Sequence, residues 1–118
     1  IEGGVKAATI TGSAAANRLR GWEGNDVING LGGNDNINGS SNNDTIDGGT
    51  GTDTIEGGFG NDTVKGGAGR DAIAGGADSD VIKARDGVAE SVNCGFGIDR
   101  AEVDRGDSVG TLCETIIR

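Results

Sequence analysis

The stretch that decides the fold is Gly57-Gly58-Phe59-Gly60-Asn61-Asp62-Thr63-Val64-Lys65, the most complete copy of a nine-residue unit. Glycine opens nine consecutive units, at residues 3, 12, 21, 30, 39, 48, 57, 66 and 75. The eighth position is always aliphatic: Ile10, Leu19, Ile28, Ile37, Ile46, Ile55, Val64, Ile73 and Ile82. The sixth position is aspartate in seven units, Asp26, Asp35, Asp44, Asp53, Asp62, Asp71 and Asp80, and Ala8 or Asn17 in the first two. So regular a period indicates a repeat architecture rather than a flexible acidic linker.

Each half of the unit predicts one local structure. The glycine-rich half predicts a tight turn, because glycine readily adopts positive φ. The second half alternates polar, apolar and polar, as in Thr54-Ile55-Glu56, which predicts a short strand with one inward side chain. Repetition of this pair predicts a coil whose strands lie parallel to those two units away, about 4.8 Å apart. We therefore predict an all-β fold, a parallel β-roll (β-solenoid) with two nonapeptides per coil.

Composition excludes several classes of function. The 118 residues include no histidine, so a Ser-His-Asp triad and an imidazole zinc site are excluded. A formal charge of −9 with 3% aromatic residues argues against nucleic-acid binding, and no apolar run reaches membrane-spanning length. The repeat itself accounts for each carboxylate, so we expect no enzyme. Because the chain starts at Ile1, we expect a processed form or a fragment.

The acidic corners of the repeat need a cation. Residues 21–83 carry eleven acidic and three basic side chains, a net charge of −8. Successive coils bring these carboxylates close together, and the thin aliphatic ladder does not offset their repulsion. Carboxylate and carbonyl oxygens, without imidazole or thiolate in the array, favour calcium over zinc or copper.

The unit resembles GGxGxDxUx, the nonapeptide of the RTX, or haemolysin-type, calcium-binding repeats. This resemblance implies a right-handed parallel β-roll that folds on Ca²⁺, with each ion between turns two units apart. It divides the chain into degenerate repeats or N-terminal cap strands at 1–20, seven calcium-binding repeats at 21–83 and a C-terminal capping segment at 84–118.

The resemblance also implies six oxygen ligands for each ion. The earlier turn supplies its aspartate and its second and fourth carbonyls, and the later turn supplies its aspartate and its first and third carbonyls. Five ions would join Asp26 to Asp44, Asp44 to Asp62, Asp62 to Asp80, Asp35 to Asp53 and Asp53 to Asp71. The implied carbonyl ligands belong to Trp22, Gly24, Leu31, Gly33, Gly39, Ser40, Ser41, Asn42, Gly48, Gly49, Thr50, Gly51, Gly57, Gly58, Phe59, Gly60, Gly66, Ala68, Gly75 and Ala77. Asn17 and Asp99 would form terminal sites and raise the number of ions to six or seven.

Departures from the repeat carry further expectations. Trp22 and Leu31 replace the second glycine, so we expect the sites they help to form to be weaker. Trp22 either covers an edge of the core or presents a ring to a sugar or partner. Two cysteines, Cys94 and Cys113, suggest a disulfide that would stabilise the cap by about 3 kcal/mol and imply an oxidising compartment; two buried free thiols are the alternative.

Three functions fit these features. The first is a secreted or cell-surface calcium-binding structural module, alone or attached to a larger extracellular protein. The second is a subunit of a fibre or adhesin assembled by end-to-end stacking of rolls, with the strand around Val5 to Ile10 as its docking edge. The third is an ice-binding roll, which needs regular threonine ranks, whereas Gly49-Thr50-Gly51-Thr52-Asp53 occurs once.

Overall fold

The computed structural model describes residues 4–110 and 112–118 of the chain. Within these residues every regular element is a strand, and all paired strands are parallel. One sheet has the order β1 (Thr9–Ser13), β3 (Val27–Leu31), β5 (Thr45–Asp47), β7 (Thr63–Lys65), β9 (Val81–Lys83), β11 (Arg100–Glu102) and β13 (Thr115–Ile117). The other has the order β2 (Arg18–Arg20), β4 (Asn36–Asn38), β6 (Thr54–Gly58), β8 (Ala72–Gly76), β10 (Ser91–Asn93) and β12 (Ser108–Val109).

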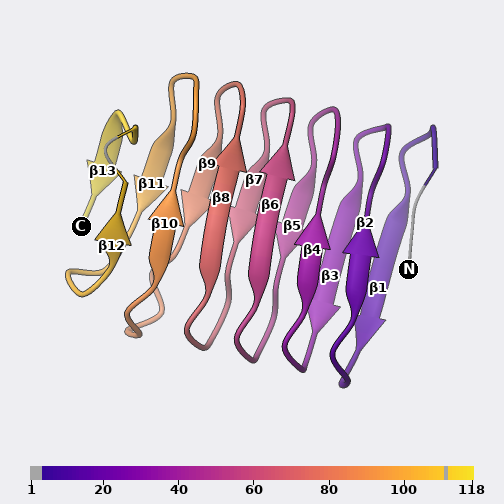
Figure 1. Cartoon of the computed structure of the whole chain (residues 1–118), viewed down its shortest axis with the longest axis horizontal. Helices are drawn as coiled ribbons and strands as arrows, with labels where there is room; N and C mark the ends of the chain where they lie inside the picture. Colours follow the sequence, from indigo (N-terminus) through magenta and orange to yellow (C-terminus); the bar gives the residue numbers. More distant parts are fainter. Residues whose placement is uncertain (1–3, 111) are drawn as a thin grey trace.

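The two sheets face each other across a thin core. Figure 1 shows them as two layers whose strands run in opposite directions, with the chain ends at opposite ends of the roll. Strand partners lie one coil apart, so Ile28 pairs with Ile46 in one sheet and Ile37 with Ile55 in the other. All nine eighth-position aliphatic residues are at most 3% exposed. The predicted parallel β-solenoid with two nonapeptides per coil is confirmed.

The predicted turns are also confirmed. Every residue at the second and fourth positions of the seven full repeats has a φ between 67° and 109°. Five of them are not glycine: Trp22, Leu31, Ser40, Asn42 and Asp78. The ring of Trp22 lies outside the core, 44% exposed, with the Arg20 guanidinium 4.7 Å from its centroid. At the first edge of the roll, β1 begins at Thr9 rather than near Val5, because the preceding segment forms a turn in which Gly4 accepts a hydrogen bond from the Glu23 N–H.

Both sheets continue beyond Lys83, but the coils there have irregular lengths. Ser91 pairs with Ala72 and Arg100 with Val81, so each of these coils contains one residue more than a regular coil. The next coils are shorter than a regular one, since Ser108 pairs with Ser91 and Thr115 with Arg100. A disulfide joins Cys94 to Cys113, with their Cα atoms 5.1 Å apart, so the predicted disulfide is confirmed. The assignment of residues 84–118 to a separate capping segment stays a prediction.

Candidate metal sites

The aspartates of the repeat form two buried rows, one along each edge of the roll. Each aspartate immediately precedes a strand, where the turn ends and the chain enters the sheet. One row contains Asp26, Asp44, Asp62, Asp80 and Asp99, and the other contains Asp35, Asp53 and Asp71. All eight side chains are at most 3% exposed. The regular register of the strands therefore stacks like charges at every coil.

One oxygen of each carboxylate is used by the backbone. The Oδ1 atom of Asp44 accepts a hydrogen bond from the Asp26 N–H at 2.8 Å, and Asp62 Oδ1 accepts one from the Asp44 N–H at 2.8 Å. The other row repeats this contact, for example between the Asp35 N–H and Asp53 Oδ1 at 2.8 Å. These bonds hold each carboxylate against the coil before it.

The second oxygen of each carboxylate has no such partner. The Oδ2 atoms of all eight aspartates are buried without a hydrogen bond. A buried polar atom without a partner is rare and costly, and a buried carboxylate is normally paired with a cation. The eight unpartnered Oδ2 atoms are therefore available as hard donors to a cation.

A backbone carbonyl converges with this free oxygen at nearly every regular turn. A Cβ atom built at Gly39 would lie 2.5 Å from Asp44 Oδ2 and 2.6 Å from the carbonyl oxygen of Gly57. The same pair of oxygens approaches the opening glycine of five other turns: Gly21, Gly30, Gly48, Gly57 and Gly75. The first glycine is thus required by space, and the converging oxygens form a cradle of the hard donors that calcium prefers.

Burial and repulsion both disfavour ionised aspartates in the absence of metal. Burial, with a smaller effect from the carboxylate one coil earlier, raises the pKa of Asp44 and Asp53 to about 6. The same causes raise the pKa of Asp62, Asp71 and Asp80 to about 7. Hydrogen bonds from the backbone act in the opposite direction but do not outweigh burial. A divalent cation between coils would reverse this effect by favouring the ionised form.

Two further groups of predicted ligands, the second-position carbonyls and Asn17, have defined places in the structure. The second-position carbonyls of Trp22, Leu31, Ser40 and Gly58 each accept a hydrogen bond from the third-position N–H one coil later, such as Phe59 N–H to Ser40 O at 2.8 Å. Since a carbonyl has two lone pairs, this contact leaves one available for a metal. Asn17 Oδ1 and the Gly30 carbonyl both lie 2.6 Å from a Cβ built at Gly12, so Asn17 occupies the aspartate position of its turn.

The acidic rows extend further than the repeat predicted. The Asp80 N–H donates to Asp99 Oδ1 at 2.7 Å, and the Asp99 N–H donates to Glu114 Oε2 at 2.9 Å. In the other row, the Glu90 N–H donates to Asp107 Oδ1 at 2.9 Å. Sequence reasoning missed Glu90, Asp107 and Glu114, because it sought aspartate at a spacing of two regular units. The signal was an acidic residue directly before a polar-apolar pair, as in Asp107-Ser108-Val109.

Parallel coils, left-handed turn positions and buried aspartate rows define a repeat β-solenoid whose turns carry hard oxygen donors. The family model for the RTX calcium-binding nonapeptide repeat matches residues 2–37, 29–64 and 47–82. These matches cover more than half of the chain, which therefore belongs to this calcium-binding repeat family. No curated protein and no solved structure matches the chain significantly.

Proposed function

We propose that this chain is an extracellular structural module whose coils fold on calcium and are held together by it. The observation that carries the proposal is the row of buried, unpartnered Oδ2 atoms, most of which converge with a carbonyl oxygen at a regular turn. The thin two-layer core adds to it, because the principal extents of the molecule are 35 × 29 × 13 Å. So small an apolar interior needs a further source of stability, and metal binding supplies free energy directly to folding.

The proposed ions lie between aspartates one coil apart. About five fit the regular turns, at the positions that join Asp26, Asp44, Asp62 and Asp80 along one edge and Asp35, Asp53 and Asp71 along the other. Asn17 and Asp99 extend the two rows at their ends. Each ion would receive carboxylate and carbonyl oxygens from two turns, within the six to eight oxygens that calcium takes. Calcium then acts as a structural bridge, and the proposal includes no catalytic step.

Two features support an extracellular location. RTX repeats are typical of secreted bacterial proteins, and the Cys94–Cys113 disulfide is of a kind that persists in oxidising compartments. In the described part of the chain, no helical segment has the length and apolarity needed to cross a membrane.

The test combines calcium titration with a charge-neutral variant. In chelator the far-UV circular dichroism of the full chain should show coil, and millimolar calcium should restore the β signal. Asp44→Asn keeps the Oδ1 acceptor but removes the charge shared by two proposed sites, so calorimetry should show weaker binding of two ions. Asp47→Asn is the matched control, because Asp47 lies at the far end of the same strand, β5, on its outer side. Equal calcium binding in both variants would contradict the proposed sites.

Assembly into a fibre is the second candidate. In the described residues, the edge strands β1 and β13 of one sheet and β2 and β12 of the other end the roll without a further strand. Unpaired parallel edges at opposite ends of one molecule permit head-to-tail stacking. Sedimentation of the calcium-loaded chain over a range of concentrations distinguishes the two: a constant monomer mass supports the lone module, and growth in mass supports the fibre.

A further inference from the structure

A cluster of three carboxylates lies where the regular array meets the irregular coils. Asp71, Asp86 and Glu90 each offer an oxygen, and these oxygens lie within 4.8 Å of one another. Asp71 ends the turn of the last regular repeat in its row, whereas Asp86 and Glu90 belong to the irregular turn that follows β9. Opposite ligands of one calcium ion are separated by about twice the 2.3–2.6 Å Ca–O distance, so one ion can contact all three groups.

Four of the six carboxylate oxygens of this cluster have no hydrogen-bond partner among the described residues. Glu90 is 3% exposed, and both of its Oε atoms are buried without a hydrogen bond. The Oδ2 atoms of Asp71 and Asp86 are likewise buried and unpartnered. Their Oδ1 atoms accept hydrogen bonds from the Asp53 and Val88 N–H groups, respectively. The three carboxylates therefore hold four oxygens without a hydrogen bond, and one oxygen of each residue lies within 4.8 Å of the others.

Glu90 departs from every other acid that continues the rows. Asp99, Asp107 and Glu114 each give one oxygen to the N–H of the acidic position one coil earlier. Glu90 occupies the equivalent position after Asp71 but gives neither oxygen to a hydrogen bond. Its carboxylate is therefore available as a whole, as in sites where a glutamate binds calcium through both oxygens.

The regular carbonyl ligand is displaced at this turn. The three atoms nearest to a Cβ built at Gly66 belong to Asp71 and Ile73, the third at 3.3 Å. No carbonyl of the following coil approaches as it does at Gly39 or Gly48. This turn therefore lacks the close carbonyl of the regular turns, and the carboxylates of Asp86 and Glu90 beside Asp71 raise the negative charge there.

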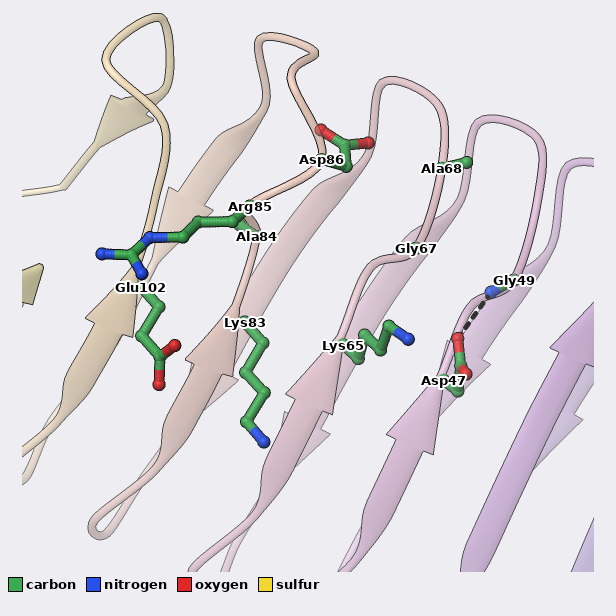
Figure 2. A pocket seen from close by; sticks show the side chains of 10 residues that line it. All are labelled: Asp47, Gly49, Lys65, Gly67, Ala68, Lys83, Ala84, Arg85, Asp86 and Glu102. Carbon is green, nitrogen blue, oxygen red and sulfur yellow. Dashed lines mark hydrogen bonds between the residues drawn. The ribbon is translucent and has the colours of Figure 1, made fainter. Parts of the chain in front are cut away.

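No basic side chain neutralises the cluster in the described part of the chain. The ion pair found among the described residues joins Arg100 to Glu102, at 3.8 Å, and includes none of the three carboxylates. Figure 2 shows the side chains of Lys83 and Arg85 pointing away from Asp86. A surface depression lined in part by Asp71, Glu90 and Arg70 opens beside the cluster to solvent, and no ion pair joins Arg70 to these carboxylates in the described part of the chain.

We propose that Asp71, Asp86 and Glu90 form a calcium site of a different kind from the repeat sites, held by three carboxylates at the junction of the array and the C-terminal coils. This proposal depends on the proposed function in one respect: the coil that carries Asp71 must be folded. The site would tie the first irregular turn to the last regular one through side chains, and its donor set lies outside the GGxGxD pattern.

The test counts calcium ions on the full chain by equilibrium dialysis and measures their affinities by calorimetry. The double variant Asp86→Asn, Glu90→Gln keeps side-chain size and removes two charges, and it should bind one ion fewer than the wild type. Glu56→Gln is the control, because Glu56 is exposed on the outer face of β6 in the same sheet. The single variant Asp86→Asn keeps the Oδ1 acceptor for Val88 and should weaken one ion roughly tenfold, since charge count tunes affinity.

The outcomes separate this site from the repeat sites. Loss of one ion in the double variant but not in Glu56→Gln supports the junction site. Identical ion numbers and affinities in the wild type, Asp86→Asn and the double variant would overturn it, while leaving the repeat sites intact. A wild-type chain that binds one ion, which the double variant loses, would support the junction site and overturn the repeat sites.

Discussion

The regular array at residues 21–83 and the irregular coils at 84–118 build the same two sheets, but different groups fill the space inside their turns. In the array, glycine opens each unit and leaves space in which Asp Oδ2 meets a carbonyl oxygen. In the irregular coils the residues before or after the strands include Ala84, Cys94 and Val103, which are at most 2% exposed. The array thus keeps its turn interiors for oxygen ligands, whereas the later coils fill more of that space with apolar side chains.

In the irregular coils, side chains add contacts to the backbone hydrogen bonds that continue between coils. Asp104 Oδ2 accepts hydrogen bonds from the Asp86 and Gly87 N–H groups, and Asp107 Oδ2 accepts one from the Asp104 N–H. The Cys94–Cys113 disulfide adds a covalent bond between coils. We infer that the array depends on bound ions for its stability, while the C-terminal coils carry contacts that persist without them.

The largest expected effect is that of pH on the ion-free array. The folded pKa values of about 6 for Asp44 and about 7 for Asp62 lie above the ordinary value of 3.8, which the unfolded chain keeps. The ion-free fold therefore holds protons that the unfolded chain releases between pH 4 and 7. The contribution of these groups to the stability of the ion-free fold is fully present below pH 4 and is lost as the pH rises through 6 to 7.

Calcium should have the opposite pH dependence, because it binds ionised carboxylates. Calcium-stripped protein brought from pH 8 to pH 5 should gain far-UV β signal, whereas the calcium affinity at pH 5 should be lower than at pH 8. Hydrogen exchange resolved by segment would show whether β4 to β7 gain protection while β11 and β13 change less. Ion-free protein that gains no β signal on acidification would contradict the assigned pKa directions.

The next effect is that of the disulfide, and it should be confined to the C-terminal coils. Replacement of Cys94 and Cys113 by serine opens a cross-link between positions separated by 19 in the sequence, which corresponds to about 3 kcal/mol of unfolding free energy. Denaturant unfolding in saturating calcium should show this loss, whereas the number of bound ions should not fall. Reductant should destabilise the wild type but not the serine variant. Loss of the array ions in that variant would show that the two regions are not separable.

The sequence predicted the array well because one period carries all of its determinants. The eighth-position aliphatic residues, the sixth-position aspartates and the left-handed second and fourth positions all recur in every unit, and the structure uses each in one way. Beyond Lys83 the coils are first longer and then shorter than a regular coil, which removes the period although the strands remain. The approach of Asp86 to Glu90 depends on the path of one irregular turn, which no spacing rule encodes.

The smallest effect compares one glycine from each region. A methyl group at Gly39 would lie 2.6 Å from the backbone carbonyl oxygen of Gly57 and 2.5 Å from Asp44 Oδ2, so two coils must move apart to accept it. At Gly106 the nearest atom to such a methyl group is the Cβ of Ala89, at an ordinary 3.6 Å. Gly39→Ala should therefore lower the free energy of unfolding in calcium by about 1–3 kcal/mol.

Gly106→Ala should change the same free energy by less than about 0.5 kcal/mol. Calorimetry should also show weaker calcium binding in Gly39→Ala but not in Gly106→Ala, because the displaced Gly57 carbonyl is a proposed ligand and no oxygen cradle exists at Gly106. Equal behaviour of the two variants would contradict the spatial requirement for glycine at position 39. A loss of stability accompanied by weaker calcium binding in Gly39→Ala alone would tie this glycine to the ion.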